Sequence, residues 1–314
     1  MRLSRGLVRA LKVGVSLGLL GWIAHRYGGD AAFRSAITKL EPRTWLLSLG
    51  CLAVGLGTSA ARWKVLLEGA GVSVPYSQTV RLYFQGYFFN TFLPTTVGGD
   101  VARGLGIEAR HPATVVAGSI LVERILGFAC LLVIGLAAAL THPELALARG
   151  ILLGASAVFV VGLLLLLALP LPSAGGDGAG SRLWGGMRRT ALEVRAYGFR
   201  PGALVTAGVL SLGWQALLIA SNAILSAGLG GVAPVKSLVA LVPVVQATTM
   251  IPVSFGGLGV RETAYEVFFR ASGFEASGAV ALSLSWLAVS LTLAMIGGVL
   301  TLFVPIARKG GRDD

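Results

Sequence analysis

The sequence is poor in charged residues. Only 13% of its 314 residues are Asp, Glu, Lys or Arg, whereas soluble domains carry about 25%. Hydrophobic residues make up 55% of the chain, and the mean hydropathy is +0.79. So little charge is hard to reconcile with a water-soluble domain, and we predict an all-α polytopic membrane protein.

Cysteine and histidine are scarce as well. Cys51 and Cys130 both lie inside apolar runs, which is typical of small packing residues. His25, His111 and His142 lie at segment ends without the spacing of metal ligands. No phosphate-binding loop of the GxxxxGK[ST] type occurs. We therefore expect no metal, no other cofactor and no direct use of ATP.

Long apolar runs dominate what remains, and a membrane-crossing helix needs about 20 such residues. The predicted full spans are 11–25, 44–61, 113–141, 148–169, 203–228 and 276–304. The first is short and follows a basic start, but WIAHRYGG offers no small-x-small cleavage site, so we expect a retained span. We interpret the stretches 82–97 and 237–253 as re-entrant, while full crossings, giving eight membrane segments, stay open.

The basic residues gather at the ends of the spans. The net charge is +12, and with a cytoplasmic N-terminus most Lys and Arg fall on the cytoplasmic side, as the positive-inside rule requires. We expect both termini in the cytoplasm and the protein in the cytoplasmic (cell inner) membrane. No basic run carries interleaved aromatics, so we expect lipids with anionic or polar headgroups as partners, and no nucleic acid.

One motif occurs twice. Residues 91–103 read TFLPTTVGGDVAR, and residues 249–261 read TMIPVSFGGLGVR. Proline ends a helical hydrogen-bond ladder and glycine adds backbone freedom, so each copy predicts a helix that stops and a new one that begins near the arginine. The residues assigned to these breaks are Pro94, Gly98, Gly99, Pro252, Gly256, Gly257 and Gly259.

A broken helix inside a membrane survives only against protein or a watery cavity, because exposed amides are costly in hydrocarbon. The new helix offers free N–H groups and the positive end of its dipole to an anion. Arg103 and Arg261 add a guanidinium suited to phosphate. Close packing of the glycines and simple snorkelling of the arginines are the plainer alternatives.

Three predicted spans separate the two copies, so the second copy is inverted relative to the first. Paired interruptions of opposite orientation indicate a transport site between inverted repeats. We divide the single membrane domain 1–314 into half-repeat 1, about 1–141, and half-repeat 2, about 148–305. The cytoplasmic linker 170–200 joins them, and its basic part fits either an interfacial helix or a solvated linker.

Two further charges interrupt an apolar span, Glu123 and Arg124 in SILVERILGF. Each costs about 2.5–3.5 kcal/mol at the bilayer centre, so we expect partners, with Asp100 and Arg103 as candidates. Alternatively, the pair lies at the interface, or Asp100 and Arg103 satisfy each other at i, i+3. With Asn90 beside the first break, the candidate substrate-binding residues are Asn90, Asp100, Arg103, Glu123, Arg124, Arg261 and Glu262.

The segments GYFFNTFLPTTVGGDVAR, VERILG and PVSFGGLGVRE resemble a flippase-like membrane family over roughly residues 10 to 305. That family includes the transmembrane region of lysylphosphatidylglycerol synthetases and membrane proteins found with hopanoid-biosynthesis enzymes. The resemblance implies lipid translocation between leaflets. Some relatives carry a soluble aminoacyltransferase domain; the sequence ends at Asp314, and we expect that domain and its activity to be lacking.

The hypothesis is therefore a lipid transporter and not an enzyme, with no catalytic residue assigned. A non-transporting scaffold that docks partners through 182–200 is one alternative. An intramembrane lipid-modifying enzyme with Glu123, Asp100 or Glu262 as acid or base is another. A lipid-synthesis enzyme as partner and a homo-oligomer both stay open.

Overall fold

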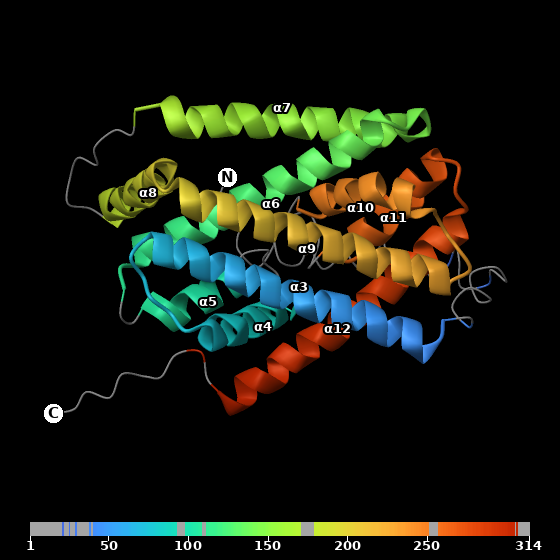
Figure 1. Cartoon of the computed structure of the whole chain (residues 1–314), viewed down its shortest axis with the longest axis horizontal. Helices are drawn as coiled ribbons and strands as arrows, with labels where there is room; N and C mark the ends of the chain where they lie inside the picture. The colour runs from blue at the N-terminus through green and yellow to red at the C-terminus, as the bar shows by residue number, and fades with distance from the viewer. Residues whose placement is uncertain are drawn as a thin grey trace.

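The computed structural model describes residues 40–92, 98–108, 111–170, 179–250 and 257–304, together with Ile306 and isolated positions before residue 40. The predicted span 11–25 lies almost wholly outside the described residues. So do Pro94, Pro252 and Gly256. Figure 1 shows a bundle of helices, several of which run the length of the molecule.

Within this part of the chain, five helices are long and apolar enough to cross a membrane. They are α3 (Pro42–Gly69), α6 (Ala113–Leu140), α7 (Ala146–Ala168, preceded by the short η1, Pro143–Leu145), α9 (Pro201–Gly228) and α12 (Ala276–Phe303). All five were predicted from their apolar runs, and the all-helical membrane architecture is confirmed. Pro42 and Pro201 begin α3 and α9, where proline's missing N–H costs nothing.

One predicted boundary is wrong in a way that matters for the site. The span ending at residue 61 continues as α3 to Gly69. Arg62 and Trp63, which look like the flanking residues of a span, are therefore part of the helix and are buried. The chain turns only at Gly71, whose φ of 80° suits glycine.

Each motif copy overlaps the end of one short helix and the start of the next, as predicted. The first joins α4 (Tyr76–Phe92) to α5 (Gly98–Glu108), and the second joins α10 (Val235–Thr249) to α11 (Val260–Ala271). The α4–α5 pair is antiparallel, because Gln78 contacts Gly106 while Asn90 contacts Gly99. Figure 1 shows α4 and α5 towards one end of the bundle and α10 and α11 towards the other.

Helices from the first part of the chain pack against helices from the second part. Helix α3 lies along α9, α12 packs on α4, and α6 packs on α10. Small residues allow these close approaches. A Cβ on Gly135 of α6 would lie 2.8 Å from Pro243 of α10, and one on Gly55 of α3 would lie 2.7 Å from the ring of Trp214. The interior between the α4–α5 pair and the α10–α11 pair is thus built from both halves of the chain.

The linker contains the helix α8 (Ala179–Ala196), followed by the short η2 (Tyr197–Phe199). Helix α8 packs on α6, and Arg195 donates to the carbonyls of Leu166 (2.9 Å) and Leu169 at the end of α7. Leu183 and Met187 stay exposed on its surface. These features favour an interfacial helix over a solvated linker.

Candidate functional site

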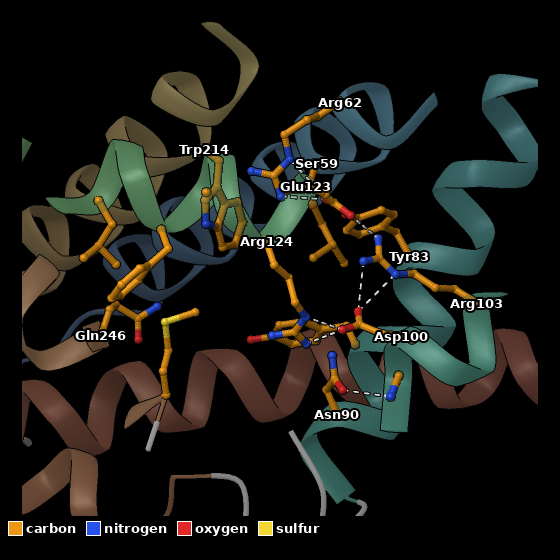
Figure 2. A pocket seen from close by; sticks show the side chains of 18 of the residues that line it. Ser59, Arg62, Tyr83, Asn90, Asp100, Arg103, Glu123, Arg124, Trp214 and Gln246 are labelled. Atoms are coloured by element: carbon orange, nitrogen blue, oxygen red, sulfur yellow. Dashed lines mark hydrogen bonds and ion pairs between the residues drawn. The ribbon is translucent and has the colours of Figure 1, made fainter. Parts of the chain in front are cut away.

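A pocket of about 260 Å³ opens in the middle of the bundle, between the two helix interruptions. Its walls come from α3, α4, α5, α6, α9 and α10. Asn90 and Gly99 border it beside the first interruption, and Thr249 and Met250 border it beside the second. Both copies of the motif therefore reach one pocket, whose side chains are shown in Figure 2.

Glu123 of α6 is the centre of the charged wall. Its Oε1 accepts hydrogen bonds from Nε (3.1 Å) and Nη2 (2.7 Å) of Arg62 on α3. Its Oε2 lies 2.7 Å from Nη1 of Arg103 on α5. Glu123 is only 1% exposed, so its charge is compensated by protein side chains. One carboxylate thus joins three helices.

Asp100 of α5 extends the network towards the pocket. Its Oδ1 accepts a hydrogen bond from Nε of Arg103 (3.1 Å) and lies 2.9 Å from Nη2 of the same residue, and its Oδ2 pairs with Arg124 of α6. Asp100 and Arg103 therefore pair with each other at i, i+3, and both also contact charged residues of α6. The charges form one chain in the order Arg62, Glu123, Arg103, Asp100, Arg124 (Figure 2).

Aromatic rings fix Arg103 in place. Its guanidinium carbon lies 4.7 Å from the ring centroid of Trp63 and 4.5 Å from that of Tyr83, a cation–π geometry. Trp63 is itself held by a 3.1 Å hydrogen bond from Nε1 to Ser119 Oγ. Arg103 therefore does not snorkel to the membrane surface; it is locked inside the bundle.

The network carries more positive than negative charge. Among the described residues that line the pocket, the charged ones are Arg62, Arg103, Arg124, Asp100 and Glu123, an excess of one positive charge. The side chain of Arg124 is 36% exposed, against 5% for Arg103. The accessible end of the chain of ion pairs is therefore an arginine, whose guanidinium is suited to an anion in the pocket.

Asn90 and the glycines shape the first interruption. Asn90 Oδ1 accepts a 2.8 Å hydrogen bond from the Gly99 N–H, one of the amides that the start of α5 leaves without a helical partner. A Cβ on Gly99 would overlap the carbonyl of Gly86 on α4. Asn90 thus holds α4 against the start of α5, and Gly99 is required for the close packing of the two.

The second copy is arranged differently, because Arg261 and Glu262 do not line this pocket. Arg261 Nε and Nη2 both lie 3.3 Å from Glu262 Oε1, and Glu262 Oε2 accepts a 2.6 Å hydrogen bond from the Gly259 N–H. Gly257 and Gly259 have φ of 77° and 80°, which glycine adopts easily. The start of α11 is therefore capped and neutralised by its own carboxylate.

Comparison with known proteins bears on this arrangement. The sequence profile of the lysylphosphatidylglycerol synthase TM region matches residues 9–298. The chain belongs to this family. It is accordingly a membrane protein linked to lipid metabolism or transport. No curated protein matches the sequence.

In this family member, sequence reasoning missed several residues of the charged wall. Arg62, Trp63 and Tyr83 were not among the candidates, although Arg62 contacts Glu123 and also donates to Ser211 on α9 (3.1 Å). The signal was present: the helical pattern of α3 runs on to the glycines at 69 and 71.

Proposed function

We propose that this family member moves a lipid with an anionic or polar headgroup between the leaflets of the cytoplasmic membrane. The headgroup occupies the pocket while the acyl chains stay in the bilayer. The observation that carries this proposal is an ion network of three arginines and two carboxylates that lines one pocket between two interrupted helices. A volume of about 260 Å³ suits a headgroup and not a whole lipid.

The arrangement of the helices supports alternating access. The series α3, α4, α5, α6 and the series α9, α10, α11, α12 both consist of a long helix, two short ones and a long one. Each long fourth helix packs on the first short helix of the other series. We propose that these are inverted half-repeats within 1–141 and 148–305, and such halves rock about a central site.

The positions of several helix ends support one orientation of the protein in the membrane. The C-terminal end of α12, helix α8 and the outer ends of α4 and α5 all lie at one end of the bundle (Figure 1). This end carries basic residues such as Arg189 and Arg195 on α8. We assign it to the cytoplasm by the positive-inside rule.

Leaflet translocation in liposomes tests the function. Purified protein is reconstituted with an acyl-labelled phosphatidylglycerol, and the label's accessibility to a membrane-impermeant quencher is followed in time. Arg124→Gln should slow translocation roughly tenfold or more, because a charge-assisted hydrogen bond contributes about 1.5–3 kcal/mol. Arg270→Gln is the matched control, since Arg270 is exposed in the last turn of α11 and does not line the pocket.

Both variants are checked for folding by thermal unfolding in detergent. Arg103→Lys adds a second test, because it keeps the charge but loses the guanidinium fork. If folded Arg124→Gln and Arg103→Lys both translocate the lipid at the wild-type rate, the proposed function is wrong. If wild-type liposomes translocate no faster than protein-free ones while the lipid still binds, a scaffold role is favoured instead.

A further inference from the structure

A second cavity lies outside the central pocket, between the linker helix α8 and the membrane-spanning helices α6 and α7. It is a groove of about 420 Å³, a size typical of small-molecule sites. Its described lining comes from Leu121 and Ile125 of α6, Leu166 of α7 and one face of α8 between Leu183 and Val194. Figure 1 shows α8 at the end of the bundle where α6 begins and α7 ends.

The groove is apolar. Thr190 carries the only polar side chain among the described residues that line it, and its hydroxyl already donates to the Gly186 carbonyl at 3.0 Å. Water in such a space would lack the polar partners that it needs, and an empty space would forfeit the contacts of the atoms around it. The lining therefore favours an apolar occupant.

The groove is narrow at one end and open at the other. Near its narrow end a Cβ on Gly118 of α6 would lie 2.7 Å from the Cβ of Glu193, and the adjacent Val194 is 7% exposed. About three turns earlier on α8, Leu183 is 70% exposed. A Cβ on Gly186 would meet nothing within 4 Å. An extended hydrocarbon chain can therefore enter at the Leu183 end and lie along α8.

Positive charge lies beside the groove. Helix α8 contains four arginines and one glutamate, a composition that attracts anionic lipids to an interfacial helix. Arg195 lies at the edge of the groove, because it follows Val194 and its Nε donates to the carbonyl of Leu166 at 2.9 Å. Its Nη2 donates to the Leu169 carbonyl. Within the described residues its Nη1 has no partner, so this group can donate to a phosphate oxygen.

Helix α6 separates this groove from the central pocket. Leu121 and Ile125 line the groove, whereas Arg124 and Phe128 line the pocket. The groove is therefore a site of its own, on the other side of the helix that carries the charged wall.

We infer that the groove binds one acyl chain of an anionic phospholipid, whose phosphate contacts Arg195. The lipid belongs to the leaflet at the α8 end of the bundle and joins α8 to α6 and α7. This site lies outside the central pocket, and the inference goes beyond the proposed function without depending on it.

Photo-crosslinking of the full-length protein in phosphatidylcholine liposomes tests the inference. The probe is phosphatidylglycerol with a diazirine in one acyl chain, and the labelled positions are mapped by mass spectrometry after proteolysis. Wild-type protein should be labelled on α8 and around Leu121 and Ile125. A phosphatidylcholine probe with the same chains should label these positions roughly tenfold less, as expected for one charge-assisted hydrogen bond.

Gly186→Leu places a side chain in the groove and should reduce this labelling roughly tenfold. The change also replaces glycine within a helix by a better helix former, so α8 itself is not weakened. Gly162→Leu on α7 is the matched control, because a Cβ there also meets nothing within 4 Å but Gly162 does not line the groove. If folded Gly186→Leu is labelled like the control, no acyl chain occupies the groove and the inference is wrong.

Arg195→Gln tests the phosphate contact and should make the two probes label the groove equally. Arg189→Gln is its control on the same helix, since Arg189 is exposed and does not line the groove. This variant should keep the preference for phosphatidylglycerol. Equal labelling of wild-type protein by both probes, or an unchanged preference in Arg195→Gln, would overturn the recognition of an anionic headgroup.

Thermal unfolding of each variant in detergent checks folding and tests another occupant, the predicted span 11–25, which lies almost wholly outside the described residues. If a segment of the chain filled the groove, wild-type protein would not be labelled there and Gly186→Leu would unfold at a lower temperature than Gly162→Leu. That result would overturn the lipid site. Arg124→Gln should be labelled in the groove like wild type, so a failure of translocation and a failure of this site are distinguishable.

Discussion

Gly99 packs directly on Gly86, so that a Cβ on Gly99 would overlap the Gly86 carbonyl oxygen. This contact sets the distance between α4 and α5 and hence the position of Asp100 and Arg103, which follow Gly99 on α5. Added volume at Gly99 would therefore displace the start of α5 and, with it, both charged residues.

We predict that Gly99→Ala lowers both stability and lipid translocation. Overpacking a close contact costs about 1–3 kcal/mol, and here backbone must move to relieve it. Gly154→Ala on α7 is the control, because a Cβ there meets nothing within 4 Å. Thermal unfolding in detergent and the liposome assay measure the two effects. Equal behaviour of the two variants would contradict the packing role of Gly99.

Removing Glu123 should destabilise the protein more than removing Arg62. Glu123→Gln deprives both Arg62 and Arg103 of a buried partner, and breaking a buried pair costs about 3–5 kcal/mol. Arg62→Met leaves Glu123 paired with Arg103, so the loss is smaller. Denaturant unfolding of the two variants and of the double variant gives the order, and a larger loss for Arg62→Met would contradict the network.

Substitution of two glutamates one turn apart on α11 should have different effects on stability. Glu262→Gln weakens the cap on Gly259 and the pair with Arg261, so we expect a loss of about 1–3 kcal/mol. Glu266 is only 7% exposed and its Oε2 has no hydrogen-bond partner within the described residues. Glu266→Gln should therefore leave stability unchanged or raise it. Thermal unfolding measures both, and a large loss for Glu266→Gln would reveal a partner for its carboxylate.

Tyr197, at the junction of α8 and α9, provides a prediction about pH. Its hydroxyl donates to the Leu66 carbonyl at 2.8 Å, and burial raises its pKa from the ordinary value of about 10 to about 12. A raised folded-state pKa contributes stability that is complete below the unfolded value and is lost as the pH rises through the folded one.

The stability gap between wild type and Tyr197→Phe should therefore be constant from pH 7 to pH 9, at about 1 kcal/mol. It should shrink as the pH rises above about 10 towards 12. Unfolding measured at several pH values checks this. A gap that already narrows between pH 7 and 9 would show that the hydroxyl ionises too easily for the buried hydrogen bond.

The spans and the helix interruptions could be predicted because each has a local cause. The five described spans follow from apolar runs, and the starts of α5 and α11 follow from the glycines of each motif. Partners of opposite charge were expected for Glu123 and Arg124, since buried charges require countercharges. The division into half-repeats and the substrate-binding roles stay predictions.

The rest depends on tertiary packing. Arg62 looks like the end of a span because a charge after an apolar run usually marks the membrane surface. Its burial depends on partners from other helices, Glu123 and Ser211. The two motif copies share a threonine, a proline, two glycines and an arginine in register, although Leu258 takes the place of Asp100 in the second. Yet Glu262, next to Arg261, caps its own helix, whereas Asp100 connects Arg103 to another helix. Sequence spacing does not reveal which partner a side chain finds.

Because Glu262 satisfies Arg261 internally, only the first of the two motif copies places its charged residues in the ion network that lines the pocket. Two equivalent copies would let a headgroup dock in either of two opposed poses. With one charged wall, a lipid bound as proposed keeps its phosphate against α5 and α6 whichever leaflet it came from, and only its acyl chains need to swing from one side of the bilayer to the other.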